Sequence, residues 1–340
     1  MQKSDVPHQT KAIHVFDMVK FICALLVIAI HTAPLEPYSA IADFYLCDVL
    51  ARIAVPVFFG IAGFLFAQKL NLLRAIQRIL LLYLGWSMVY LVIQIPQWYH
   101  SGWWGIHVIK DFLSALILKG SYYHLWYLLA TFYAYPLLYG ALKKFSSAGI
   151  WITVAVLWMG ECLTYSYSWL WIDKIDSICF LLEQFSGIFD GVFRALPLML
   201  VGVLSGKYAH TRSQNDWGIR ALVSFAFVAL EASVLYFFTP NSEKYSYLVA
   251  TPFFTYYAIC YLLRSCFQFR DPNLAKHLRN SSLVIYCSHP FVDFAINKLS
   301  WGHGIIRWIT VTVISTGGAL LYSKMSMKHR ALRSAVKGSD

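Results

Sequence analysis

Charged residues are scarce in this chain. Asp, Glu, Lys and Arg make up 13% of its 340 residues, about half of their share in a soluble globular protein. Hydrophobic residues make up 59%, and the mean hydropathy is +0.56. A soluble chain of this composition could not cover its own surface with polar groups. The composition therefore predicts an all-α, polytopic integral membrane protein and argues against any sizeable soluble part.

The sequence also lacks the patterns that mark metal sites, disulfide frameworks and linkers. Its seven cysteines form no CxxC pair, and most lie in apolar stretches, which argues against a zinc site or a disulfide framework. Because no Pro-, Gly- or Ser-rich linker interrupts the chain, we expect one membrane domain over residues 1–340. Its core is expected at about 12–325, followed by a basic tail at 326–340. The first apolar stretch is too long for a cleavable signal peptide.

About ten apolar stretches approach the roughly 20 residues that a membrane-crossing helix needs. They lie at 14–34, 47–67, 75–95, 123–142, 150–168, 190–206, 218–238, 246–264, 281–299 and 304–323. The stretch 101–118 is shorter and amphipathic, so we expect it to lie at the membrane interface.

The net charge of +11 is spread over short connections between apolar stretches, which argues against nucleic-acid binding. Lys and Arg collect in alternate connections, and this bias predicts that both termini are cytoplasmic. The opposite connections are mostly acidic: Glu36, Asp43, Asp48, Asp173, Asp176, Glu183 and Glu243.

Ionisable residues inside apolar stretches are costly and therefore informative. Asp17 and Lys20 are spaced as an ion pair on adjacent helical turns. Lys20 and His31 are eleven residues apart, so they lie about 16 Å apart on nearly the same face of one helix. His31 suits either a structural hydrogen bond between helices or the role of a proton acceptor near neutral pH.

Further polar residues are expected near the depth of His31. Arg52 precedes Pro56 at the start of the second stretch, and it either faces a cavity or reaches outward to solvent. His124 lies in an aromatic belt with Trp126, and Asp190 and Arg194 are spaced as an ion pair. Helix counting predicts that His31, Arg52, His124 and Arg194 converge in the outer half of the bundle, with His289 near mid-membrane.

These motifs, in this order, resemble those of the acyltransferase-3 family of integral membrane acyltransferases. The motifs are Phe16-Asp17-x-x-Lys20 with His31, Arg52-x-Ala-Val-Pro-Val-Phe-Phe, His124-Leu-Trp-Tyr-Leu, Arg194-x-x-Pro197, and Ser282-Leu-x-Ile-Tyr-x-x-His-Pro290. The resemblance implies ten core helices and transfer of an acyl group, with acetyl as the default, from cytoplasmic acyl-CoA to a hydroxyl of an exported acceptor such as a cell-envelope sugar. It also implies a multi-pass protein of the bacterial cytoplasmic membrane, surrounded by lipid and without a metal.

The resemblance implies roles for single residues. His31 corresponds to the catalytic histidine, with Arg52 or His124 stabilising the oxyanion. Lys20, Arg74 and Arg78 are expected to bind the phosphates of acyl-CoA. Trp126, Asp190, Arg194 and His289 are the expected substrate-binding residues. Three features depart from the family pattern. Lys20 replaces an arginine, and the paired arginines Arg74 and Arg78 are four residues apart instead of three. Ala62 stands where family members often carry serine.

One branch of the family offers an alternative function. The segments Tyr123-His-Leu-Trp-Tyr127 and Phe189-Asp-Gly-x-x-Arg194 look like the membrane half of vancomycin-resistance serine racemases. Those proteins carry a soluble pyridoxal-phosphate racemase domain after the last helix, which the present sequence does not contain. Under this reading the membrane domain binds or transports serine. Arg52 or Arg194 would then pair with the serine carboxylate, and Asp190 with its ammonium group.

Overall fold

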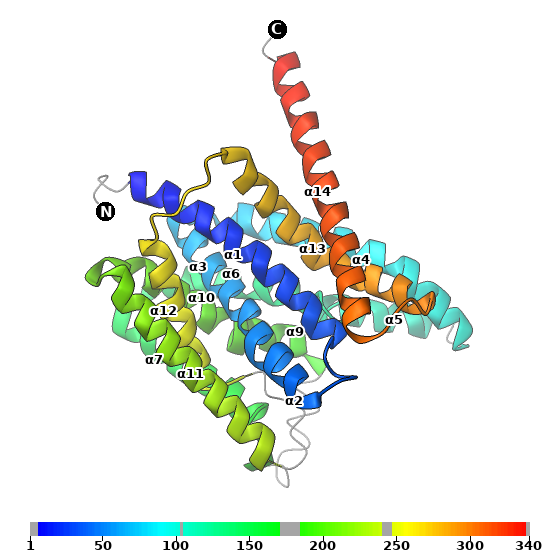
Figure 1. The fold of residues 1–340 in the computed structure, drawn as a ribbon, viewed down its shortest axis with the longest axis horizontal. Helices are drawn as coiled ribbons and strands as arrows, with labels where there is room; N and C mark the ends of the chain where they lie inside the picture. Colours follow the sequence, from blue (N-terminus) through cyan, green and yellow to red (C-terminus); the bar gives the residue numbers. More distant parts are fainter. Residues whose placement is uncertain (1–5, 103–104, 171–183, 240–246, 338–340) are drawn as a thin grey trace. The chain divides into compact units, whose positions relative to one another are not determined.

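The computed structural model describes residues 6–102, 105–170, 184–239 and 247–337, and these residues form helices and their connections, with no strand among them (Figure 1). Asp173, Asp176, Glu183 and Glu243, which support the predicted orientation, lie outside the described residues. The chain folds into two compact units. The first unit comprises 1–54 and 262–340, and the second comprises 55–261. The prediction of one domain over 1–340 therefore stays a prediction.

The first unit joins the two ends of the chain. Its helices are α1 (Val6–Thr32), the short α2 (Ala40–Asp43), α13 (Pro272–Lys298) and α14 (Gly304–Lys337). Between α2 and the next long helix, the chain forms a π-helical turn at Phe44–Leu50 and a 3₁₀ turn at Ala51–Ile53. α13 packs against both α1 and α14. Helices from opposite ends of the sequence therefore build this unit.

The second unit holds most of the remaining helices. They are α3 (Ala54–Lys69), α4 (Leu72–His100), α5 (Ile106–Ser114), α6 (Trp126–Lys144), α7 (Ser147–Thr164), α9 (Ser186–Phe189), α10 (Leu196–Tyr208), α11 (Gln214–Phe238) and α12 (Thr251–Arg264). Its core centres on α10, where Leu198, Met199 and Leu200 are almost completely buried. α10 is apolar all round, as expected of a helix enclosed by others.

Two glycine contacts let α3 lie directly on α10. A methyl group added to Gly202 would overlap the carbonyl oxygen of Gly60, and one added to Gly63 would overlap the carbonyl oxygen of Met199. Small residues at such positions allow two helix backbones to approach closely. The glycines of the second apolar stretch therefore have a packing role.

The prediction of a polytopic helical membrane protein is confirmed. Seven helical segments of the described chain are long and apolar enough to cross a membrane: His14–Thr32, Ala40–Lys69, Leu72–His100, Ser147–Thr164, Ser186–Thr211, Gln214–Phe238 and Gly304–His329. The three other predicted stretches form α6, α12 and α13. The count of about ten crossings and the cytoplasmic location of both termini stay predictions. The stretch 101–118 forms α5 and a π-helical turn, and its interfacial position also stays a prediction.

Candidate functional site

Two histidines meet in the first unit. His31 lies in the last turn of α1, and His289 is fully buried in α13. Their ring centroids are 5.3 Å apart and the ring planes differ by 25°, so the imidazoles are stacked. Stacked imidazoles in a buried setting disfavour a state in which both rings are positively charged. The pair is therefore suited to carry at most one positive charge.

The hydrogen bond of His289 determines which of its nitrogens carries the proton. Its Nδ1 lies 3.1 Å from the carbonyl oxygen of Ile285. A carbonyl can only accept, so Nδ1 donates, and in the neutral ring Nε2 keeps the lone pair. This bond anchors His289 to its own helix and sets the orientation of the ring that stacks on His31.

Arg52 belongs to the same unit and is held by Asp48. Its Nε and one terminal nitrogen lie 3.1 Å and 3.0 Å from one carboxylate oxygen of Asp48. Both side chains are about one-third exposed. The 3₁₀ turn that carries Arg52 packs against α1, the helix of His31. Arg52 is thus a cation that Asp48 orients on a turn next to this helix.

The middle of α1 carries the predicted ion pair. Lys20 Nζ lies 2.7 Å from a carboxylate oxygen of Asp17, which is buried. This contact confirms the pairing predicted from the spacing. Asp17 also has a second cationic neighbour, Arg279 from α13.

A buried charge cluster lies in the second unit. The Arg194 Nε lies 2.7 Å and one terminal nitrogen 2.6 Å from Glu161 Oε1, and the other terminal nitrogen lies 3.0 Å from Asp190. All three side chains are buried. The ion pair predicted between Asp190 and Arg194 is confirmed, and it lies in a π-helical turn at Asp190–Ala195. The guanidinium is thus shared by two carboxylates.

Aromatic rings surround this guanidinium. Its central carbon lies 3.9 Å from the ring centroid of Tyr247, 4.8 Å from that of Trp126 and 5.2 Å from that of Tyr165. A guanidinium over the faces of aromatic rings is attracted by their electron density, so these rings help to stabilise the buried cation. The Trp126 ring, expected to contact a substrate, contacts Arg194 in this structure.

His124 lies before α6 among tyrosines and is almost completely buried. Its ring centroid is 4.9 Å from that of Tyr90, 5.5 Å from that of Tyr123 and 5.7 Å from that of Tyr122. Tyr83 holds the segment that precedes this cluster in the chain. Its hydroxyl donates a hydrogen bond to the Leu116 carbonyl at 2.7 Å and accepts one from the Ser121 amide at 3.0 Å.

Arg74 and Arg78 lie in the first turns of α4 and are exposed. Asn71 caps this helix by accepting a hydrogen bond from the Arg74 amide at 3.0 Å. The two guanidinium groups are one turn apart and neither makes an ion pair within the described part of the chain.

The expected site residues thus fall into two groups. Lys20, His31, Arg52 and His289 belong to the first unit, and Arg74, Arg78, His124, Trp126, Asp190 and Arg194 belong to the second. The predicted convergence of His31 and Arg52 with His124 and Arg194 therefore stays a prediction.

Sequence reasoning missed three charged partners of these residues, which are Asp48, Glu161 and Arg279. Asp48 was detectable, since it lies one helical turn before Arg52. Glu161 was detectable, since it is the one acidic residue in the apolar stretch 150–168. The sequence did not indicate that Arg279 pairs with a buried carboxylate. Its position in a basic connection indicated only the orientation of the chain in the membrane.

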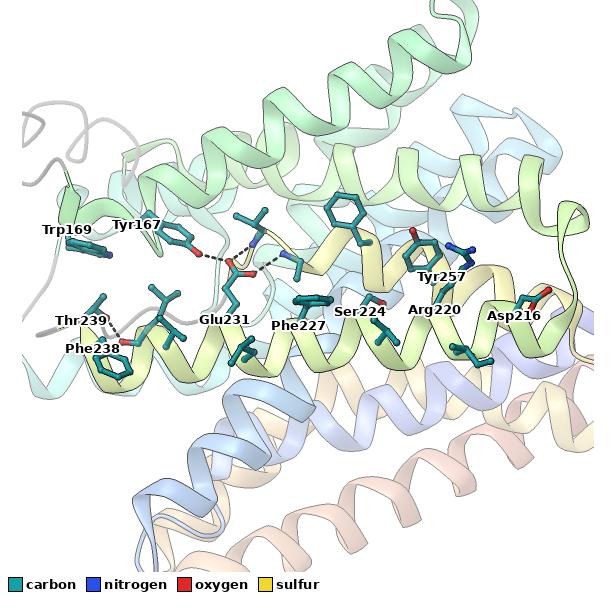
Figure 2. Close-up of a pocket in the computed structure, with 18 residues that line it drawn as sticks. Tyr167, Trp169, Asp216, Arg220, Ser224, Phe227, Glu231, Phe238, Thr239 and Tyr257 are labelled. Carbon is teal, nitrogen blue, oxygen red and sulfur yellow. Dashed lines mark hydrogen bonds between the residues drawn. The ribbon is translucent and has the colours of Figure 1, made fainter.

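A long groove lies along α11 (Figure 2). It has a volume of about 1080 Å³, and α12 and the Tyr167–Trp169 segment form its other walls. The one carboxylate in its middle is Glu231, which accepts hydrogen bonds from the Tyr167 hydroxyl at 2.5 Å and from the amides of Val249 at 2.7 Å and Ala250 at 3.0 Å. Glu231 therefore satisfies backbone donors just before α12 begins, which is a structural role.

Comparison with known proteins decides the family. A family model described as an acyltransferase domain matches residues 13–324. The chain belongs to this acyltransferase family. Its membership agrees with the resemblance inferred from the motifs around His31, Arg52, His124, Arg194 and His289. Within the described residues, no group of three or more His, Cys, Asp or Glu side chains could hold a metal ion.

The curated relatives of this acyltransferase-family chain are racemases. It is 24% identical to a serine/alanine racemase of Enterococcus gallinarum, over 93% of this chain and 46% of the relative. It is 26% and 24% identical to two amino-acid racemases of Enterococcus faecalis, over 62% and 94% of this chain and 30% and 47% of those relatives. The chain therefore spans less than half the length of these relatives. No solved structure matches it.

Proposed function

We propose that this protein transfers an acyl group, acetyl by default, from cytoplasmic acyl-CoA to a hydroxyl of an exported acceptor such as a cell-envelope sugar. The stacked pair of His31 and His289 carries the proposal, because it provides a base that is oriented by a second imidazole. The family match over residues 13–324 supports acyl transfer as the reaction class. The bacterial cytoplasmic membrane is the proposed location.

His31 is proposed to act as the general base. It takes the proton of the acceptor hydroxyl as the oxygen attacks the thioester carbonyl. The C–S bond then breaks, the ester forms, and the coenzyme A thiolate takes the proton back from the imidazolium. No net proton is gained or lost. His289 is proposed to orient the His31 ring, since it is itself anchored to the Ile285 carbonyl.

The remaining predicted residues have supporting roles in this proposal. Arg52 or His124 is proposed to stabilise the oxyanion that forms on the thioester carbonyl. Lys20, Arg74 and Arg78 are proposed to bind the donor's phosphates. Trp126, Asp190 and Arg194 are proposed to shape the acceptor pocket. Arg194 would do so through the cluster that it forms with its two carboxylates, since its guanidinium nitrogens already bond to them.

The test is replacement of His31. We expect His31→Ala membranes to lose at least about 100-fold in acyl-CoA-dependent acylation, the usual contribution of a general base. Expression and monodispersity should remain near wild type. The matched control is His303→Ala, which changes an exposed histidine in the same unit. Full activity in a well-folded His31→Ala protein would eliminate the assignment.

The racemase relatives favour a second candidate, a module that binds or transports serine. Under this reading, coenzyme A is not a ligand and the basic residues serve only to orient the protein in the membrane. The two candidates differ in which compound raises the melting temperature of the detergent-solubilised protein. Stabilisation by acetyl-CoA supports the acyltransferase, whereas stabilisation by L-serine alone supports the serine module.

A further inference from the structure

A cluster of one carboxylate and two cations lies between α1 and α13. Asp17 is 2% exposed. One of its oxygens lies 2.7 Å from Lys20 Nζ, and the other lies 3.8 Å from a terminal nitrogen of Arg279. Both helices belong to the first unit, so this contact lies within one compact part of the chain. Lys20 and Arg279, which are 259 positions apart in the sequence, therefore share one carboxylate.

The Arg279 guanidinium is held loosely. Its contact with Asp17, 3.8 Å, exceeds hydrogen-bond distance, and its side chain makes no hydrogen bond to another described residue. It is 44% exposed, whereas Asp17 is buried. The carboxylate therefore positions the guanidinium while leaving its N–H donors available. A planar fork of donors recognises the oxygens of phosphate in a bidentate manner.

The charge around the cluster favours an anionic ligand. Lys20 and Arg279 together carry two positive charges against the one negative charge of Asp17, which leaves an excess of +1. Lys276 lies one turn before Arg279 on the same exposed face of α13. The cluster thus combines a buried anchor, a point charge and a fork of donors, which is the set of groups that a phosphate ester requires.

We propose that Lys20 and Arg279 form a binding site for a phosphate of the acyl-CoA donor, with Asp17 as the residue that positions both cations. This inference rests on the proposed acyltransferase function and adds Arg279 to it. Lys20 and His31 lie about 16 Å apart along α1. A donor held by its phosphate at Lys20 and Arg279 would extend its pantetheine arm along this helix, towards the histidine pair.

The experiment measures coenzyme A binding by isothermal titration and the KM for acetyl-CoA in detergent-solubilised protein. We expect Arg279→Gln to raise both the Kd for coenzyme A and the KM for acetyl-CoA by about tenfold or more. The kcat should stay within about twofold, since the residue binds the donor and does not take part in bond breaking. Arg279→Lys keeps the charge but loses the fork, so it should fall between. Lys298→Gln, an exposed lysine at the other end of α13, is the matched control and should change both values less than twofold.

A compensating variant separates a binding role from a structural one. Lys20→Arg combined with Arg279→Gln returns a guanidinium to the same carboxylate, and we expect it to recover part of the lost affinity. Unchanged coenzyme A binding in a folded Arg279→Gln protein overturns the proposal, even if acyl transfer itself is demonstrated. Conversely, coenzyme A binding that depends on Arg279 in a protein that transfers no acyl group supports the site and refutes the proposed function.

Discussion

The Arg194 cluster allows a ranked prediction of stability. Glu161 Oε1 accepts a hydrogen bond from Arg194 Nε at 2.7 Å and forms an ion pair with a terminal nitrogen of Arg194 at 2.6 Å, and both side chains are buried. A hydrogen bond to a charged group contributes about 1.5–3 kcal/mol. Glu161→Ala loses this hydrogen bond and the ion pair but also relieves the repulsion between Glu161 and Asp190. We therefore expect it to lower the free energy of unfolding by about 3 kcal/mol.

Two further variants separate hydrogen bonding from charge. Glu161→Gln keeps an acceptor oxygen and removes the excess negative charge, so it should cost less than half as much as Glu161→Ala. Arg194→Ala leaves two buried carboxylates without their shared cation, and breaking buried ion pairs in this way costs about 3–5 kcal/mol. The expected loss in the free energy of unfolding is largest for Arg194→Ala, smaller for Glu161→Ala and smallest for Glu161→Gln.

The assay is the loss of monodisperse protein on heating in detergent. For domains of 150–250 residues, 1 kcal/mol corresponds to about 2–4 °C, so Glu161→Ala should lower the melting temperature by roughly 6 °C or more. Asp48→Asn is the control, because its pair with Arg52 is about one-third exposed and such pairs contribute about 1 kcal/mol or less. If Glu161→Ala costs no more than Asp48→Asn, or Glu161→Gln costs as much as Glu161→Ala, the reasoning is wrong.

Two contacts within the separate units give further predictions. Gly202→Ala should lower the melting temperature strongly or prevent folding, because its methyl group would overlap the Gly60 carbonyl and overpacking costs about 1–3 kcal/mol or more. The control Gly140→Ala should be tolerated, since Gly140 has open space around it. Equal melting temperatures for the two variants would refute this account. Asp293→Asn should lower the free energy of unfolding by about 1.5–3 kcal/mol, since Arg307 donates hydrogen bonds to both oxygens of Asp293, at 2.8 Å and 2.7 Å. A melting temperature equal to that of the wild type would show that this pair is dispensable.

Local spacing was enough to predict several contacts. Asp17 with Lys20, and Asp190 with Arg194, are three and four residues apart, and an α-helix brings such positions together whatever surrounds it. Arg52 was also recognisable from the sequence as a candidate, since it is a charged residue within the second apolar stretch. Its pair with Asp48 was not predicted, although the spacing of four residues indicates it in the same way.

Contacts between distant segments were not predictable in the same way. Nothing in the sequence around His31 indicates that His289 stacks on it, because 257 intervening positions leave their relative placement undetermined. The same holds for Glu161, which reaches Arg194 from another helix. Trp126 was expected at a substrate, and its contact with Arg194 depends on the packing of α6 beside the π-helical turn at Asp190–Ala195.

The amino-acid sequence by itself determined that this protein is a helical membrane protein of the acyltransferase family, since hydropathy, helical period and motif order are local properties of the chain. Tertiary structure alone decided which charges from distant segments neutralise one another and which imidazoles meet. A buried charge needs a partner in space, wherever that partner lies in the chain. Asp17 has one partner of each kind. The helical repeat of α1 brings Lys20 next to it, and the packing of α13 on α1 brings Arg279 near it.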